Sequence, residues 1–203
     1  MQIGPRYKKA RYLGAPVFRK TQTQKYAMRQ AAAAKTKVKG RRGGKSEFGR
    51  QMLEKQKARY SYGVSAGQFS NYVKQALQTK GDNSKNLLRI LEGRIDNAVL
   101  RAGFAVSRSA ARQMVAHGHI LVNGKKITIP SLQVFPGDKI TIREGSKNKA
   151  LFAKLDEELK AVQAPAWLAV KSDIKEITVA GEPSVDTSEL LFDVKSVLEF
   201  FTR

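Results

Sequence analysis

The chain contains two histidines, His117 and His119, and no cysteine. The two histidines would face the same side of a strand, but a zinc site needs further ligands and a hydrolytic triad needs a buried partner for its histidine. The lack of cysteine also excludes disulfides and thiolate zinc sites. We therefore expect no metal and no catalytic histidine. His117, at a predicted helix end, is expected to meet the helix dipole or a phosphate.

Two other patterns that could serve catalysis are weak. Gly43-Gly44-Lys45-Ser46 is similar to the end of a nucleotide-binding loop, but Lys39 stands where that loop requires its first glycine, and no strand pattern precedes it. Glu157 and Glu158 are adjacent on the solvated face of a predicted helix, without the isolation that raises carboxyl pKa values. The sequence therefore predicts no enzyme, no cofactor and no small-molecule substrate.

The chemistry that the sequence does favour is the binding of phosphate. Arg108 and Arg112 are one helical turn apart, so their guanidinium groups project together, and these planar forks suit phosphate oxygens. Gln113 or Asn123 could read a sugar or a base edge. The alternative is an ordinary solvated basic face. The side chains that we expect to extend the surface are Arg94, Ser107, Gln113, His117, Asn123, Lys125 and Lys126.

Two short helices must position these residues. Arg94–Ala102 has apolar residues at helical spacing and stops at Gly103. Ser107 is a predicted N-cap for a second helix, which ends at Gly118. Asp96 is close enough to Arg94 to orient it or to cap the first helix locally.

The pattern then changes to short strands. Asn123-Gly124 is a strong two-residue hairpin signal because both positions tolerate positive φ. Lys139–Arg143 alternates, with its isoleucines predicted inward and its basic ends outward. The stretch as a whole predicts a helix pair on a small twisted sheet.

The charge of the chain is unusual for its size. The 203 residues hold 38 Lys and Arg against 17 Asp and Glu, for a net charge of +21. The net charge is +16 over residues 1–60, +9 over 61–150 and −4 over 151–203. So large a charge favours a polyanionic partner, nucleic acid first and an anionic membrane second. No run of about 18 apolar residues predicts a membrane span.

Residues 1–45 contain no acidic residue. We predict a basic extended segment that orders on RNA, with cations on phosphates and tyrosines on bases, and only Ala27–Ala34 favours a helix. The alternatives are a solvated basic tail and a basic presequence. The basic residues expected to bind RNA here are Arg6, Lys8, Arg41, Arg42 and Lys45.

Three further helices are predicted next, over Ser46–Tyr60, Ser65–Lys80 and Ser84–Glu92, each with serine as N-cap. They are expected to share one small core. The positions predicted to face inward in the first of them are Phe48, Met52 and Leu53. Its predicted RNA-binding side chains are Arg50, Lys55, Lys57 and Arg59.

The acidic end of the chain has its own pattern. Ala150–Val162 predicts an amphipathic helix whose inward face includes Leu151, and Trp167 is expected to anchor a core. Ile174–Val179 alternates like a strand. An apolar stretch over Asp186–Arg203 closes the chain.

Residues 93–127 read GRIDNAVLRAGFAVSRSAARQMVAHGHILVNGKKI. They closely resemble the RNA-binding module named after small-subunit ribosomal protein S-four, a module that also occurs in some tRNA synthetases, pseudouridine synthases and heat-shock proteins. Outside the module, residues 47–73 (EFGRQMLEKQKARYSYGVSAGQFSNYV) and the ending VLEFFTR resemble the ribosomal family itself. Two departures concern the first 45 residues: the family's P-G-x-H-G motif and the zinc cysteines of some bacterial members are both missing.

The resemblance implies an α+β fold in which the module, followed by a helix and a strand, is inserted into a helical lobe. The implied domains are a basic extension (1–45), the helical lobe (46–92, rejoined by 186–203) and the module with its following elements (93–185). It implies a structural protein that binds 16S-type rRNA at a junction in the 5′ region and nucleates assembly of the subunit body. It also implies contact with ribosomal protein S-five, a place near the mRNA and a role in decoding accuracy.

Two alternatives stay open. An RNA-modifying enzyme with the same module would need a separate catalytic domain, for which no length is left. A free RNA chaperone or stress-related RNA-binding protein would need none. We expect a cytoplasmic protein of the small ribosomal subunit, with an organellar ribosome left open, and no membrane partner.

Overall fold

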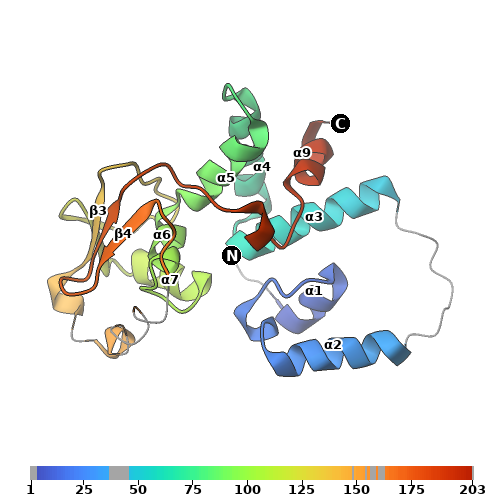
Figure 1. The fold of residues 1–203 in the computed structure, drawn as a ribbon, viewed down its shortest axis with the longest axis horizontal. Coiled ribbons are helices and arrows are strands. Elements are labelled where there is room, and N and C mark those ends of the chain that lie inside the picture. Colours follow the sequence, from blue (N-terminus) through green and yellow to red (C-terminus); the bar gives the residue numbers. More distant parts are fainter. Residues whose placement is uncertain are drawn as a thin grey trace. The chain divides into compact units, whose positions relative to one another are not determined.

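The computed structural model describes residues 4–36, 46–147, 149–153, 155, 159 and 163–202. The chain divides into two compact units (Figure 1). One comprises Met1–Ser84 and Thr187–Arg203, and the other comprises Lys85–Asp186. Helices and an antiparallel sheet are both present, which confirms the predicted α+β class. Residues 85–92, which the resemblance groups with the helical lobe, belong to the second unit by their contacts.

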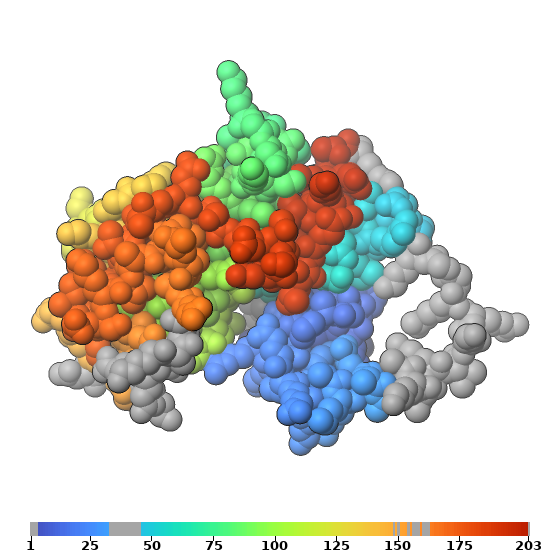
Figure 2. Space-filling view, viewed as in Figure 1, coloured from blue at the N-terminus to red at the C-terminus, as the bar shows by residue number. Residues whose placement is uncertain are grey.

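The first unit is helical and combines segments from the N-terminal and C-terminal parts of the chain. Its α-helices are α1 (Arg6–Leu13), α2 (Gln24–Thr36), α3 (Glu47–Tyr62), α4 (Ala66–Gln78) and α9 (Val194–Thr202), with short 3₁₀ turns η1 (Arg19–Thr21) and η4 (Thr187–Glu189). Helix α9 packs against α3, and the Gln51 side-chain amide donates to Glu199 Oε2 at 3.0 Å. In Figure 2 the red C-terminal residues lie beside the cyan of α3.

The prediction that the N-terminal segment is extended was wrong for the part that the structure describes. Residues 6–36 form α1, η1 and α2, and α1 ends at Gly14, whose φ of +69° suits glycine. Leu13, Phe18 and Tyr26 are buried in a small core with Leu53 of α3. These apolar residues give the basic segment enough burial to fold. The predicted RNA-binding residues Arg41, Arg42 and Lys45 lie outside the described residues.

The predicted helix starts are largely confirmed. The Ser46 and Ser65 hydroxyls accept from backbone amides in the first turns of α3 and α4. Helix α5 (Asn83–Glu92) differs, because Asp82 rather than Ser84 supplies the acceptor, for the Ser84 amide at 2.8 Å. The prediction for the inward face of α3 was partly wrong, because Phe48 and Met52 are exposed while Leu53 is buried.

The second unit packs helices on a five-stranded antiparallel sheet of order β2-β1-β3-β5-β4. Its helices include α6 (Ile95–Arg101) and α7 (Arg108–Ala116). Its strands are β1 (Ile120–Val122), β2 (Lys125–Ile127), β3 (Lys139–Ile142), β4 (Leu168–Lys171) and β5 (Glu176–Val179). The predicted hairpin is confirmed, with φ of +49° at Asn123 and +77° at Gly124. The isoleucines of β3 face inward as predicted.

The C-terminal part of this unit completes its core. Short turns η2 (Glu144–Ser146) and η3 (Ala150–Phe152) follow β3. Much of the helix predicted over Ala150–Val162 lies outside the described residues; Leu155 and Leu159 are buried, but Leu151 is exposed, contrary to prediction. Trp167 is buried in the core as predicted. Strand β5 begins at Glu176 rather than at Ile174, because Lys175 takes a positive φ in the turn before it.

Candidate nucleic-acid interface

The candidate surface is built on the paired helices α6 and α7 of the second unit. The Ser107 hydroxyl accepts from the Ala110 amide at 3.2 Å, so this residue caps α7 as predicted. Ala111, Met114 and Val115 are buried in the core. Helical periodicity then leaves Arg108 and Arg112, one turn apart, on a side that is only partly covered.

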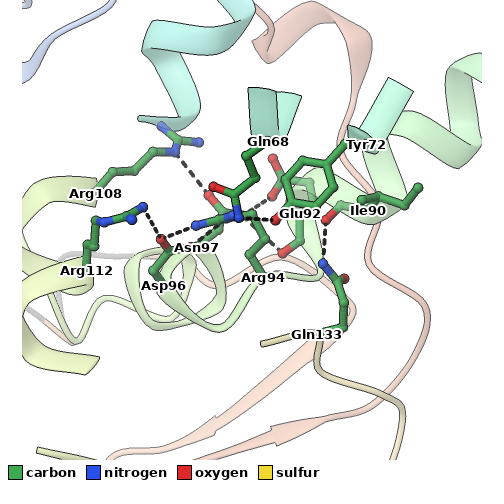
Figure 3. Close-up of polar contacts among 10 residues, drawn as sticks. All are labelled: Gln68, Tyr72, Ile90, Glu92, Arg94, Asp96, Asn97, Arg108, Arg112 and Gln133. Carbon is green, nitrogen blue, oxygen red and sulfur yellow. Dashed lines mark hydrogen bonds and ion pairs between the residues drawn. The ribbon is translucent and has the colours of Figure 1, made fainter. Parts of the chain in front are cut away.

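A buried polar layer lies beneath these arginines (Figure 3). Fully buried Glu92 accepts from the Asn97 side-chain nitrogen at 2.6 Å and from two guanidinium nitrogens of Arg101 at 3.0 and 3.1 Å. Asp96 accepts two hydrogen bonds from Arg94, at 3.0 and 2.6 Å. Burying charged groups is costly unless they are paired and hydrogen-bonded, and here an arginine donates two hydrogen bonds to each carboxylate.

The same layer reaches the two arginines of α7. Asn97, which donates to Glu92, accepts through its side-chain oxygen from Arg108 Nε at 3.1 Å. The Arg112 guanidinium lies 3.8 Å from Asp96 Oδ2, an ion-pair distance too long for a hydrogen bond. The Arg112 side chain is 39% exposed. A hydrogen bond from Asn97 therefore orients Arg108, while Arg112 faces the Asp96 carboxylate at ion-pair distance (Figure 3).

Arg94 was predicted to contact RNA, and the structure shows that this was wrong. Its side chain is 0% exposed, and its guanidinium faces Asp96. The sequence did indicate that Asp96 and Arg94 interact, and that part is confirmed. The role of Arg94 is therefore to hold the Asp96 carboxylate, which in turn faces Arg112.

The remaining predicted residues of this unit are exposed but do not form one surface. Gln113 and His117 are exposed on α7 and at its C-cap. Lys125 and Lys126 are exposed on β2, and because successive strand residues face opposite sides of a sheet, they point to different faces. The prediction that both lysines extend one surface does not fit this alternation.

The Asn123 side chain makes hydrogen bonds within the protein. Its side-chain nitrogen donates to Asp138 Oδ1 at 2.8 Å, and its oxygen accepts from the Lys139 amide at 2.9 Å. These bonds tie the β1–β2 turn to the start of β3. We therefore withdraw the prediction that Asn123 reads a base edge and assign it to the hairpin.

The predicted cations of the first unit are mostly engaged within that unit. On α3, Arg50 pairs with Glu47, and Lys57 pairs with Glu54 at 2.6 Å. The Arg59 guanidinium lies 4.5 Å from the Tyr60 ring centre. Lys55 lies 3.8 Å from the ring centre of Phe200, and burial, followed by the charge of Arg59, lowers its pKa. On α1, Arg6 is half-buried and Lys8 is exposed.

Sequence reasoning gave no role to Arg101 or to the environment of His119. Arg101 is paired with buried Glu92, a contact between residues nine apart that no simple periodicity reveals. His119 is buried beside several cations, and burial, followed by Lys149, His117 and other cations, lowers its pKa. Arg143, expected only to face outward, is among those cations.

Neither a helix suited to span a membrane nor a metal-binding cluster is present among the described residues. No helix among them is both long and apolar enough to cross a membrane. In the same part of the chain, no three His, Cys, Asp or Glu side chains come together in a way that could hold a metal ion.

Comparison with known proteins then decides the family. Residues 2–92 match the ribosomal protein S4/S9 N-terminal domain, and residues 93–140 match the S4 domain. Small ribosomal subunit protein uS4 of Chlorobium phaeovibrioides is 41% identical over 181 residues, covering 89% of each chain. The uS4 proteins of Borrelia turicatae and Borreliella burgdorferi (strain ZS7) are 34% and 37% identical, each over 97% of this chain and 95% of its relative.

The chain belongs to the uS4 family. It is therefore a ribosomal protein of the small-subunit type that carries an S4 RNA-binding domain, as the resemblance implied. The match to the S4 domain begins at Gly93 and includes α6, α7 and the strands β1 and β2. The buried polar layer and the arginines that it holds thus lie within the S4 domain, apart from Glu92 at its edge.

Proposed function

We propose that this uS4-family chain binds small-subunit rRNA directly through an arginine edge, which consists of Arg108 and Arg112 on α7. The observation that carries the proposal is the layer beneath them: Asn97 accepts a hydrogen bond from Arg108, and the Asp96 carboxylate lies within ion-pair distance of Arg112. Fixing a long side chain before binding lowers the entropy lost on binding. Guanidinium forks suit phosphate oxygens, so the edge is suited to a nucleic-acid backbone.

The charge of the edge supports a polyanion as the ligand. The two buried carboxylates, Glu92 and Asp96, are matched by Arg94 and Arg101 within the layer. The two arginines of α7 place two further guanidinium groups beside this layer. RNA is favoured over DNA because the described residues contain no recognition helix with dimer symmetry, and because an irregular RNA is read largely by shape and backbone.

Family membership supports a wider proposal. The RNA is a 16S-type rRNA, bound at a junction in its 5′ region, and binding nucleates assembly of the subunit body. The protein acts as a structural component, not as an enzyme, in the small subunit of a cytoplasmic ribosome. It contacts ribosomal protein S-five, lies near the path by which mRNA enters the subunit and supports decoding accuracy.

The experiment is the salt dependence of affinity for an rRNA fragment that contains the 5′-region junction. For Arg108→Ala with Arg112→Ala, each lost phosphate contact should reduce the slope of log affinity against log salt by about 0.7–0.9. The control, Lys171→Ala with Lys195→Ala, removes the same charge from two exposed positions elsewhere. Equal slopes for the wild type and the arginine variant would place the RNA on another surface.

A sedimentation experiment separates this proposal from a free RNA chaperone. A structural component should remain with the small subunit through a high-salt wash of a sucrose-gradient fraction. Release of the protein to the top of the gradient, together with unchanged subunits, would favour the chaperone.

A further inference from the structure

A second cationic group lies at one end of the sheet in the same unit. We call it the sheet-end corner and define it as His117, Lys126, Arg143 and Lys149, which surround the buried ring of His119. These are the cations and the neighbouring histidine whose charges act on that ring. The arginine edge contains none of them.

Strand pairing places Arg143 beside His119. Ile120 is paired with Ile142 on β1 and β3, and the Arg143 amide donates to the His119 carbonyl at 2.8 Å, which extends the same ladder by one pair. His119 Nδ1 lies 2.9 Å from the Ser146 hydroxyl. Its ring packs edge-on, with centroids 6.0 Å from His117 and 6.2 Å from Phe152. The ring is therefore fixed on several sides.

Lys126 reaches this corner because residue 118 is glycine. A Cβ built on Gly118 would lie 2.2 Å from Lys126 Cε, so the lysine stem occupies the space of the missing side chain. Gly118 also has a φ of +68°, which favours glycine independently. By register, Lys126 lies opposite Leu121, and Leu121 lies opposite Thr141. Lys126 and Arg143 consequently belong to the same face of the sheet.

The described carboxylates closest to the corner are paired with other lysines. Glu144 binds Lys147 at 2.6 Å, and Glu176, which lies opposite Thr141, is 3.9 Å from Lys171. Among the residues that the structure describes, Lys126, Arg143 and Lys149 have no carboxylate within ion-pair distance. In the same part of the chain, Arg143 Nε is buried without a hydrogen-bond partner. A buried donor of this kind is costly until an acceptor arrives.

We propose that the sheet-end corner binds a backbone phosphate of RNA, as an anion site additional to the arginine edge. A phosphate offers acceptors to the part-exposed Arg143 guanidinium and negative charge to Lys126, Lys149 and His117. The packed ring of His119 and its Ser146 contact form the floor of the corner. This inference rests on the proposed function, since it takes rRNA as the source of the phosphate.

The two histidines make the site directly measurable, because the chain contains no others and both lie at the corner. We would record their ring resonances in the full-length, isotope-labelled protein across pH, alone, with inorganic phosphate and with the rRNA fragment. An anion in the corner stabilises the protonated His119 ring, so bound RNA should raise the pKa of His119. An unchanged His119 titration in an RNA-saturated sample would overturn the inference.

Variants supply the second readout. Arg143→Gln and Lys126→Gln should each weaken RNA binding about fivefold at 0.15 M salt, the effect of losing one phosphate contact with a slope of about 0.8. Lys139→Gln removes the same charge at the opposite end of β3 and should leave affinity unchanged. If Lys139→Gln weakened RNA binding as much as Arg143→Gln, the effect would come from overall charge alone, and the proposed site would be overturned.

The outcomes separate the two proposals. Loss of binding in the arginine-edge variant, with wild-type affinity in both corner variants, would reject the corner alone. Loss in the corner variants, with wild-type affinity in the arginine-edge variant, would reject the edge as the RNA surface. Histidine shifts with inorganic phosphate that match those with RNA, together with wild-type RNA affinity in the corner variants, would identify a free-anion site and reject the RNA assignment.

Discussion

Helices α3 and α7 both carry basic side chains, but these side chains have different surroundings on the two helices. On α3, the cations pair with acids one turn away or lie over aromatic rings, as Arg50 with Glu47 and Lys55 over Phe200. On α7, Arg108 and Arg112 are held from behind by polar groups of α6. Counting basic residues cannot separate these cases. The groups that contact a basic side chain indicate whether it is oriented toward a ligand or already paired within the fold.

The largest expected difference between the two helices is in stability. Asp96→Ala should lower the free energy of unfolding by about 3–5 kcal/mol, because Arg94 would remain buried without its partner. Glu47→Ala on α3 should change it by less than about 1 kcal/mol, because the Glu47–Arg50 pair is exposed. Chemical denaturation measures both. Similar losses in the two variants would remove the distinction drawn between a buried layer and a surface pair.

The next difference is in RNA affinity. Arg50→Ala with Lys57→Ala removes two α3 cations that local glutamates already neutralise, so its salt slope should fall by less than that of Arg108→Ala with Arg112→Ala. Filter binding across salt concentrations measures both slopes, with circular dichroism as the check on folding. A larger fall for the α3 pair would make α3 the principal RNA surface.

A smaller effect should separate orientation from charge. Asn97→Ala keeps Arg108 but removes the acceptor that orients it and a donor to buried Glu92. We expect a loss of about 1–3 kcal/mol in stability and weaker RNA binding, but less weakening than Arg108→Ala causes. Affinities are to be compared under conditions in which both variants are folded. Wild-type affinity in Asn97→Ala would mean that the layer contributes stability only.

The smallest effect concerns pH. Burial and the neighbouring cations lower the pKa of His119 from its ordinary value of 6.5. As pH falls below 6.5, His119 therefore takes up a proton in the unfolded chain before it does so in the folded chain. Stability is lost over this range until the pH falls below the lowered pKa of His119 in the folded state. Denaturation midpoints should fall over this acidic window in the wild type and fall less in His119→Gln. Identical profiles would show that His119 does not contribute to the acid sensitivity.

Local structure was predictable where a few neighbouring residues decide it. The Ser46, Ser65 and Ser107 caps and the Asn123-Gly124 hairpin depend on backbone geometry within one turn, and all are present. The family resemblance supplied the overall α+β class. Helix α1 was missed because its apolar residues are sparse and gain their burial from Leu53, which is distant in the sequence.

The candidate site was predictable in part. The helical spacing of Arg108 and Arg112 correctly places them on one partly exposed side of α7. The burial of Arg94 was missed because charge alone predicts exposure, while its position depends on the partner Asp96 and on packing around it. The sheet-end corner was missed because only strand register and the space at Gly118 place Lys126 and Arg143 on the same face near His119.

The most direct test of the central claim is protein–RNA crosslinking in cells, with the attached RNA sequenced and the crosslinked peptides identified. The account predicts crosslinks in one 5′-region junction of small-subunit rRNA, attached to peptides that contain Arg108 and Arg112. Crosslinks scattered over tRNAs and many mRNAs would contradict the ribosomal role. Crosslinks to the rRNA junction through α3 alone would contradict the arginine edge.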